Sequence, residues 1–332
     1  MDAGTSASIA SRAQEHCAIC GSTGDLLYRD LGDRLFGAPG LWNISACRND
    51  ACRMLWLNPQ PLPAEIGKAY SRYYTHKAEE RGTGWRRRLL AASLHLLVDA
   101  SILLGGLRRE CVAVKSMHLH DRPPGSLLEI GCGDGGFLAR MAASGWQVQG
   151  VESDPAAATA AEEKFGIPVR VGELAEMRLA PASFDAIALN HVLEHVYHPV
   201  ALLSECRRLL KPGGLLVCIT PNAGAWGRQH YGANWRGLEP PRHLHIFSLA
   251  ALARAADLAG FSQRRVYSTA VNTWLIDSGS RALAASAPGT DVAAAARRPQ
   301  RLLASLATQL WLALRNRTRR DSGEECVLVA SK

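Results

Sequence analysis

Short apolar segments alternate with longer amphipathic ones through the second half of the chain. Five of the apolar segments stand at residues 127–130, 146–151, 168–171, 184–190 and 215–219. They have the length of buried strands, and the stretches between them can hold helices. Two further strands are predicted at residues 261–268 and 324–330. The order predicts an α/β fold with a doubly wound sheet of seven strands.

The first of these strands runs directly into a glycine-rich turn. Glu129 precedes Gly131, Gly133 and Gly136, and the next strand ends on Glu152. Glycines allow a sharp bend and let a ligand approach the backbone, and a carboxylate after the second strand can accept hydrogen bonds from ribose hydroxyls. The pattern predicts a Rossmann-like nucleotide-binding unit. Because the glycines follow G-x-G-x-x-G, a nicotinamide-dependent oxidoreductase is one alternative.

Further features distinguish this chain from dinucleotide-binding proteins. Glu129 stands two positions before the first glycine, and residues 172–174 place a second acid after the third strand. Residues 190–195 follow the fourth strand, and residues 209–214 precede the fifth. In this order and spacing, residues 125–268 resemble the class I S-adenosylmethionine-dependent methyltransferases. An acid-rimmed pocket suits a ligand with a sulfonium and an ammonium better than it suits a phosphate.

The resemblance implies S-adenosyl-L-methionine as the cofactor and assigns the residues around it. They are Glu129, Gly131, Gly133 and Gly135 at the methionine end, Glu152 at the ribose, Glu173 and Leu174 near the adenine, and Asn190 and His191 at the border of the site. His195 is expected near the transferred methyl group. Since that methyl is already activated, proximity and in-line orientation are expected to supply most of the catalysis.

Residues 191–195 also spell H-x-x-E-H, which is a metallopeptidase motif. On a helix, His191 and His195 would share a face and could bind zinc. The motif follows a strand at the place where methyltransferases close over the cofactor. We therefore interpret both histidines as cofactor-side residues.

The acceptor is expected in the long loop at residues 220–247, because ligands of doubly wound sheets bind at the carboxyl ends of the strands. We predict that His243 in this loop is the base that takes a proton from the acceptor. His245 is the second candidate, and a structural role for these histidines is the alternative. Three arginines of the loop could bind a phosphate or carboxylate of the acceptor; they are Arg228, Arg236 and Arg242.

Four of the nine cysteines form two pairs near the start of the chain. Two residues separate Cys17 from Cys20, and four separate Cys47 from Cys52. Without an apolar leader before them, we expect a cytoplasmic protein whose clustered cysteines bind metal instead of forming disulfides. The pairs predict a structural zinc site with four thiolate ligands. Four unrelated reduced cysteines are the alternative.

The cysteine pairs, residues 57–61, residues 70–74 and the domain that follows resemble a bacterial methyltransferase subgroup with an N-terminal zinc-binding module. The resemblance implies a small-molecule acceptor, such as a sugar, a polysaccharide precursor or a secondary metabolite. A different zinc-ribbon group methylates ribosomal RNA, so an rRNA or tRNA methyltransferase is the alternative. Nucleic acid is the less favoured partner, because the basic clusters are not interleaved with aromatic residues.

The formal net charge is +8, and arginine clusters flank two apolar segments at residues 89–107 and 302–314. We predict that both segments are amphipathic helices. They could pack on each other as a lid. Alternatively, they could lie in a membrane interface, where arginines meet anionic lipid and the acceptor is lipid-linked.

These observations divide the chain into three parts. Residues 1–75 are predicted to form the zinc-ribbon-like module, residues 76–122 a helical connector or lid, and residues 123–332 the methyltransferase domain. Residues 269–322 would be a helical insertion before the last strand. The sequence leaves open the acceptor, the atom that is methylated and the oligomeric state.

Overall fold

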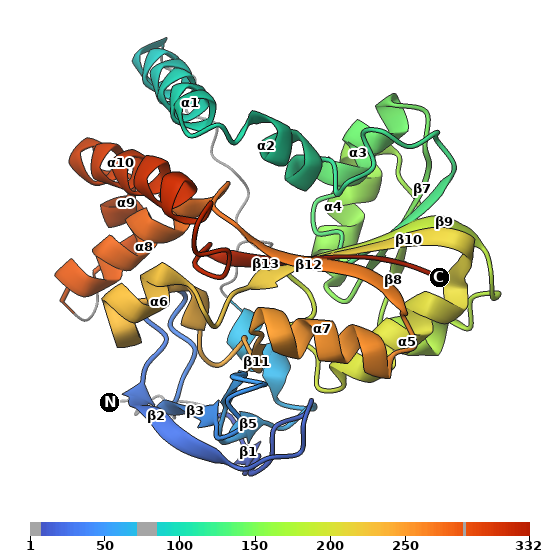
Figure 1. The fold of residues 1–332 in the computed structure, drawn as a ribbon, viewed down its shortest axis with the longest axis horizontal. Coiled ribbons are helices and arrows are strands. Elements are labelled where there is room, and N and C mark those ends of the chain that lie inside the picture. Colours follow the sequence, from blue (N-terminus) through green and yellow to red (C-terminus); the bar gives the residue numbers. More distant parts are fainter. Residues whose placement is uncertain (1–7, 72–84, 288–289) are drawn as a thin grey trace, which may run out of the picture.

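The computed structural model of the chain describes residues 8–71, 85–287 and 290–332, and the side chains of residues 85–92 lie outside the described part. Its largest sheet has the strand order β12-β13-β10-β9-β6-β7-β8 (Figure 1). The strands are β6 (Ser126–Ile130), β7 (Gln147–Glu152), β8 (Val169–Val171), β9 (Phe184–Asn190), β10 (Leu210–Pro221), β12 (Gln263–Thr269) and β13 (Glu325–Ser331). The predicted seven-stranded α/β sheet is confirmed.

One strand of this sheet, β13, runs opposite to the other six. Neighbouring strands from β8 through β10 are parallel, whereas β13 runs antiparallel to both β10 and β12. The last strand of the chain therefore inserts between β10 and the edge strand β12. Parallel strands that start together also end together, so β6, β7, β8 and β9 present their carboxyl ends at one edge.

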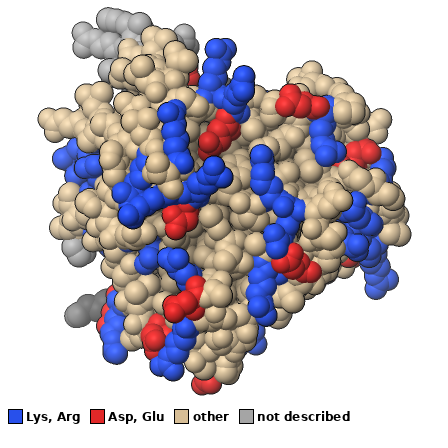
Figure 2. Space-filling model, in the orientation of Figure 1, with Lys and Arg blue, Asp and Glu red and all other residues tan. Residues whose placement is uncertain are grey.

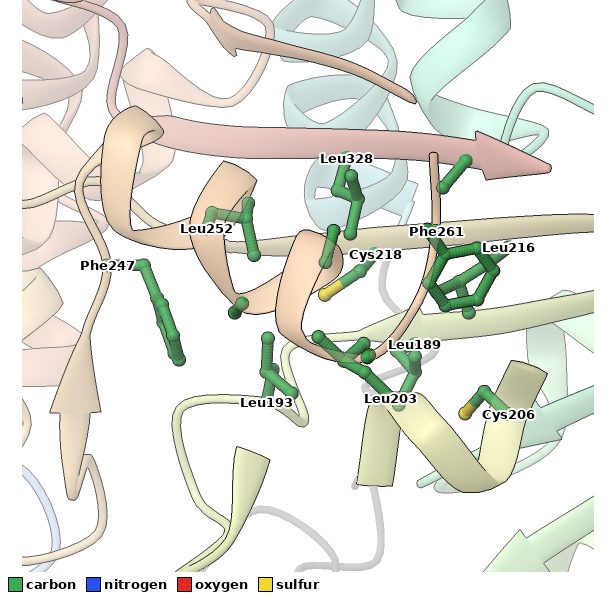
Figure 3. Close-up of a cluster of buried hydrophobic side chains, with 14 of the residues drawn as sticks. Leu189, Leu193, Leu203, Cys206, Leu216, Cys218, Phe247, Leu252, Phe261 and Leu328 are labelled. Carbon is green, nitrogen blue, oxygen red and sulfur yellow. The ribbon is translucent and has the colours of Figure 1, made fainter. Parts of the chain in front are cut away.

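Helices cover both faces of the sheet. In Figure 1, α3 (Gly136–Ala143) and α4 (Pro155–Phe165) lie above it, and α5 (Pro199–Leu209) and α7 (Leu249–Leu258) lie below it. Successive strand residues point to opposite faces. Leu189 and Cys218 accordingly join the buried cluster under α5 and α7 (Figure 3), while Ala188 and Val217 join the cluster on the other face.

The N-terminal segment forms a second, four-stranded antiparallel sheet. It contains β2 (Gly24–Leu31), β3 (Trp42–Cys47) and β4 (Leu55–Leu57), and β11 (His245–Ile246) from the loop after β10 completes it. The small strands β1 (Ser11–Arg12) and β5 (Gln60–Pro61) pair beside it, and the short helix η1 (Ile66–Tyr70) follows. Because a strand of the larger domain completes this sheet, the two parts share one core.

In the described part of the chain, five further helices either precede β6 or stand between β12 and β13. They are α1 (Trp85–Leu104), α2 (Arg108–Lys115), α8 (Thr273–Ala285), α9 (Val292–Ala296) and α10 (Pro299–Arg315). The amide of Gln309 on α10 donates to the Ser101 hydroxyl on α1 over 2.8 Å, so the two predicted helices do pack on each other. In the part of the chain that is described, no helix has the length and apolar character needed to cross a membrane.

The loop after β10 is also partly helical. It contains α6 (Trp226–Tyr231), η4 (Gly232–Asn234) and η5 (Arg236–Leu238) before β11. A further short helix, η3 (Leu174–Met177), follows β8. Helix η3 thus follows the carboxyl end of β8, and α6, η4 and η5 lie on the segment that leads from β10 to His243 and β11.

Candidate functional site

The glycine turn between β6 and α3 has the backbone that the sequence predicts. Gly131, Gly133 and Gly135 have φ angles of 66°, 53° and 74°, in the left-handed region where residues with a Cβ are disfavoured. A Cβ on Gly131 would stand 2.6 Å from Cγ2 of Val192. At Gly133, by contrast, a Cβ would meet nothing within 4 Å. The turn is therefore packed at its start and open at Gly133, where a ligand can approach the backbone.

The carboxylate of Glu152, on the neighbouring strand β7, is hydrogen-bonded to this turn. Glu152 ends β7, is 8% exposed, and accepts a hydrogen bond from the backbone N–H of Gly133 over 2.8 Å. Its other carboxylate oxygen accepts from the N–H of Asp154 over 3.0 Å. Since β6 pairs with β7 in parallel register, the glycine turn and Glu152 lie at the same edge of the sheet.

Glu129 is a buried acid whose carboxylate is incompletely satisfied. It is 4% exposed, and its Oε2 atom has no hydrogen-bond partner among the described residues. Burial raises the pKa of this carboxyl well above its ordinary value, and the positive charge of Arg140 only partly opposes the shift. A buried acceptor without a partner is costly. A cationic ligand at this edge would supply the missing partner.

The other predicted cofactor residues also lie at this edge. Glu173 is exposed and Leu174 is buried at the start of η3, directly after β8. Asn190 is the exposed last residue of β9, and His191 follows it. The parallel strands therefore gather these positions at one end of the sheet.

His191 forms an ion-pair cluster with two buried acids. Its Nδ1 lies 3.0 Å from Oε1 of Glu194, and its Nε2 lies 2.8 Å from Oε1 of Glu325. Although loss of water disfavours its charged form, these carboxylates raise the pKa of His191 to about 10. At neutral pH the ring is an imidazolium that donates both N–H groups. Residues 191–196 form a turn and no helix, so the helical arrangement that H-x-x-E-H requires in peptidases is not formed.

His195 and His243 come together from two distant parts of the chain. Their ring centroids are 4.8 Å apart, with the planes tilted by 71°. Nδ1 of His195 lies 3.0 Å from the carbonyl oxygen of Arg242, and Nδ1 of His243 lies 2.8 Å from that of Gly237. Because a carbonyl only accepts, each Nδ1 carries a proton. Burial lowers the pKa of His243 to about 4, so its ring is neutral at neutral pH.

Glu194 adjoins these two histidines, and the three side chains are of metal-ligand type. One potential ligand atom from each lies within 4.8 Å of the others. Both carboxylate oxygens of Glu194 are already engaged, since Oε1 accepts from His191 and Oε2 accepts from the Thr220 hydroxyl over 2.9 Å. Glu194 therefore places a hydrogen-bonded carboxylate beside the two histidine rings.

His245 lies apart from this pair. It is 1% exposed in β11, and its ring packs against Phe247 with centroids 6.3 Å apart. Burial lowers the pKa of His245 to about 4. His243 precedes the strand, so the two histidines are not alternate residues on one strand face, as the sequence had suggested.

Tyr70 contributes to the site, and sequence reasoning did not single it out. Its hydroxyl oxygen lies 3.1 Å from Nδ1 of His195. The residue belongs to η1 in the N-terminal segment, 125 positions before its partner. The aromatic residues at positions 70–74 were the only local sign of it.

The three arginines proposed to bind the acceptor already have partners inside the protein. Arg242 is completely buried and donates to Asp33 over 2.8 Å and to Glu239 over 3.1 Å. Arg236 is also paired with Glu239, and Arg228 donates to the carbonyl of Ala223. The prediction that Arg242 binds an acceptor phosphate is therefore wrong. Arg242 instead forms an ion pair with Asp33, which joins the N-terminal segment to the loop after β10.

The four paired cysteines form one cluster. The Sγ atoms of Cys17 and Cys52 are 3.7 Å apart, and those of Cys20 and Cys47 are 3.4 Å apart. A disulfide would need about 2.05 Å, whereas four sulfurs at 2.3 Å from one zinc ion would stand about 3.8 Å apart. Four residues separate Cys47 from Cys52, and this segment turns back on itself through hydrogen bonds from the backbone N–H groups of Cys52 and Arg53 to the carbonyl of Asn49. The donor set fits a tetrahedral zinc ion.

Comparison with known proteins agrees with this geometry. Residues 106–265 match a family described as a methyltransferase domain. A ubiquinone biosynthesis O-methyltransferase of Cereibacter sphaeroides is 36% identical over 129 residues, or 37% of this chain and 52% of that protein. The protein of the same name from Maricaulis maris is 37% identical over 131 residues, covering 36% and 51%. The chain thus spans about half the length of these relatives.

A SAM-dependent methyltransferase from Archaeoglobus fulgidus aligns with 70% of this chain and 93% of its own, at 18% identity and a TM-score of 0.43.

Proposed function

We propose that the protein transfers a methyl group from S-adenosylmethionine to an oxygen of a small-molecule acceptor. The match of residues 106–265 to the methyltransferase domain family supports this proposal. The names of the relatives support oxygen as the methylated atom. The acceptor class that we propose is a hydroxylated small molecule, with sugars, glycan precursors and secondary metabolites as candidates. A phosphate-bearing or lipid-linked form of such a molecule is included.

The residues at the carboxyl edge fit the cofactor. We propose that Glu129 faces its cationic methionine end, that the open backbone at Gly133 lies against it, and that Glu152 binds the ribose. S-adenosylmethionine supplies a methyl group already activated on a sulfonium, so the protein must mainly bind and orient the two reactants. The partnerless Oε2 atom of Glu129 is the observation that best supports this assignment. Glu173, Leu174, Asn190 and His191 would line the remaining edge.

We propose that His243 accepts the proton of the acceptor hydroxyl, with His195 beside it. The neutral ring of His243 supports this role. A base of low pKa cannot deprotonate a free alcohol, but it can take the proton while the new C–O bond makes the hydroxyl acidic. Glu194 would stabilise the imidazolium that results. The Arg242 carbonyl would keep Nδ1 of His195 protonated, and its contact together with that of Tyr70 would hold the orientation of the ring.

The N-terminal cysteine cluster would hold a structural zinc ion through Cys17, Cys20, Cys47 and Cys52. The sulfur separations support this proposal. Zinc there would stabilise the small N-terminal sheet. The chain continues from this sheet to η1, which places Tyr70 beside His195. The zinc would act on structure and take no part in methyl transfer.

The test combines binding and turnover. Calorimetry should show that S-adenosylmethionine binds and NAD does not; the reverse result would remove the proposed function. Methyl transfer from labelled cofactor is then measured on nucleotide sugars and hydroxylated aromatic compounds. In this assay His243→Ala should lose turnover and His245→Ala, the matched control, should keep more of it. Equal loss of turnover in both variants would indicate that His243 has a structural role.

A further inference from the structure

Helix α1 exposes a row of leucines that no other described part of the chain covers. Leu96, Leu97, Leu103 and Leu104 are 71%, 45%, 63% and 70% exposed. Their spacing of seven residues places them along one side of the helix. The opposite side, with Ser101 and Ile102, is buried and faces α10. We call these four residues the α1 leucine row.

Basic residues stand at the end of this row. Arg108 and Arg109 are exposed and begin α2, four residues after Leu104. Arg317 lies at the same place, because its guanidinium donates to the carbonyl of Gly105 over 3.1 Å. Three more arginines, at positions 86–88, are at the other end of α1, with side chains outside the described part. Figure 2 shows that basic side chains predominate over acidic ones on the visible face.

We infer that α1 docks on an anionic lipid surface, with the leucine row in the interface and the arginines against the headgroups. Exposed leucines beside clustered arginines are the composition of a helix that lies in the plane of a membrane. The helix would not span the bilayer, since no described helix is long and apolar enough to do so. The inference does not depend on the identity of the acceptor.

The charge distribution favours lipid over a second copy of the chain. If two copies met through parallel α1 helices, Arg108, Arg109 and Arg317 of one copy would face the same residues of the other. This arrangement places like charges together, whereas anionic headgroups neutralise them.

The docking can be tested by flotation of the full-length protein with vesicles. The vesicles contain phosphatidylcholine alone or, to give an anionic surface, about 30% phosphatidylglycerol. The double variant Leu96→Glu/Leu103→Glu removes the centre of the row. Its matched control, Leu26→Glu/Leu258→Glu, adds the same charge at leucines that are 42% and 53% exposed on β2 and α7. Thermal melting checks that both variants fold.

The wild type and the control should float with anionic vesicles and remain at the bottom of the gradient with vesicles of phosphatidylcholine alone. The row variant should lose about tenfold or more of its bound fraction, because it loses buried apolar area and gains repulsive charge. Failure of the wild type to float, or equal flotation of the row variant, would overturn the inference. So would sedimentation that shows a dimer abolished by Leu96→Glu/Leu103→Glu, since the row would then contact a second copy. Cofactor binding by calorimetry should be unchanged in every variant, which separates this result from the proposed function.

Discussion

Replacing Glu129 by glutamine should stabilise the free protein at higher pH. Burial holds the pKa of this carboxyl well above its ordinary value of 4.5 in the folded protein. Between these two pKa values the folded state binds more protons than the unfolded state, so stability falls as the pH rises through this window. Glutamine has nearly the same shape and does not titrate. The free energy of unfolding of the variant should therefore not fall as the pH rises through this window.

The same substitution should weaken cofactor binding. The structure leaves Oε2 of Glu129 without a partner, and we propose that the cationic end of S-adenosylmethionine becomes that partner. A hydrogen bond to a charged group contributes about 1.5–3 kcal/mol, so Kd should rise about 10- to 150-fold. Binding to the wild type should also release a proton, because the cation favours the ionised carboxylate.

Two measurements decide the outcome. Calorimetry in buffers of different ionisation enthalpy gives Kd and proton release, and thermal unfolding across the pH range gives stability. Glu163→Gln is the control, because Glu163 is exposed on α4. The reasoning would be refuted if Glu129→Gln bound the cofactor as tightly as the wild type. It would also be refuted if the variant were destabilised at high pH, since Glu129 would then have an ionic partner in the fold.

Three other substitutions probe the rest of the site. His243→Ala should lower turnover about 10²- to 10⁴-fold with cofactor affinity unchanged, as expected for loss of a base; a change in affinity alone would contradict this in calorimetry and initial-rate assays. Cys47→Ser should remove the bound zinc, measured by elemental mass spectrometry, and lower the melting temperature, whereas Cys111→Ser, outside the cluster, should keep the metal. Arg242→Met should cost about 3–5 kcal/mol in denaturant unfolding, because it leaves Asp33 without its cation and Glu239 with Arg236 alone; a neutral result would show that water reaches those acids.

The sequence predicted the strands and the turn that carry the proposed cofactor residues, because the signals for these elements are local. A strand, a glycine turn with left-handed φ angles and a following acid occupy a short span from Glu129 to Glu152. Apolar periodicity fixes which side of each strand is buried, and parallel strands bring their carboxyl ends to one edge. The two close-set cysteine pairs were visible for the same reason.

The proposed acceptor side of the site is formed by contacts between residues far apart in the chain. Tyr70 meets His195 across 125 positions, and Arg242 meets Asp33 across 209. The residue types at these positions fit several roles, as the reassignment of Arg242 from acceptor binding to a buried ion pair shows. The strand β11 likewise completes the N-terminal sheet, although only two residues pair there.

The sequence alone therefore determined the sheet, the glycine turn and the cysteine pairs, because neighbouring residues create those features. Only the tertiary structure decided which histidine meets which, which arginine is buried and which leucines remain exposed. Burial and partnership depend on how the segments pack against one another, and the free energy of each polar group follows from that packing.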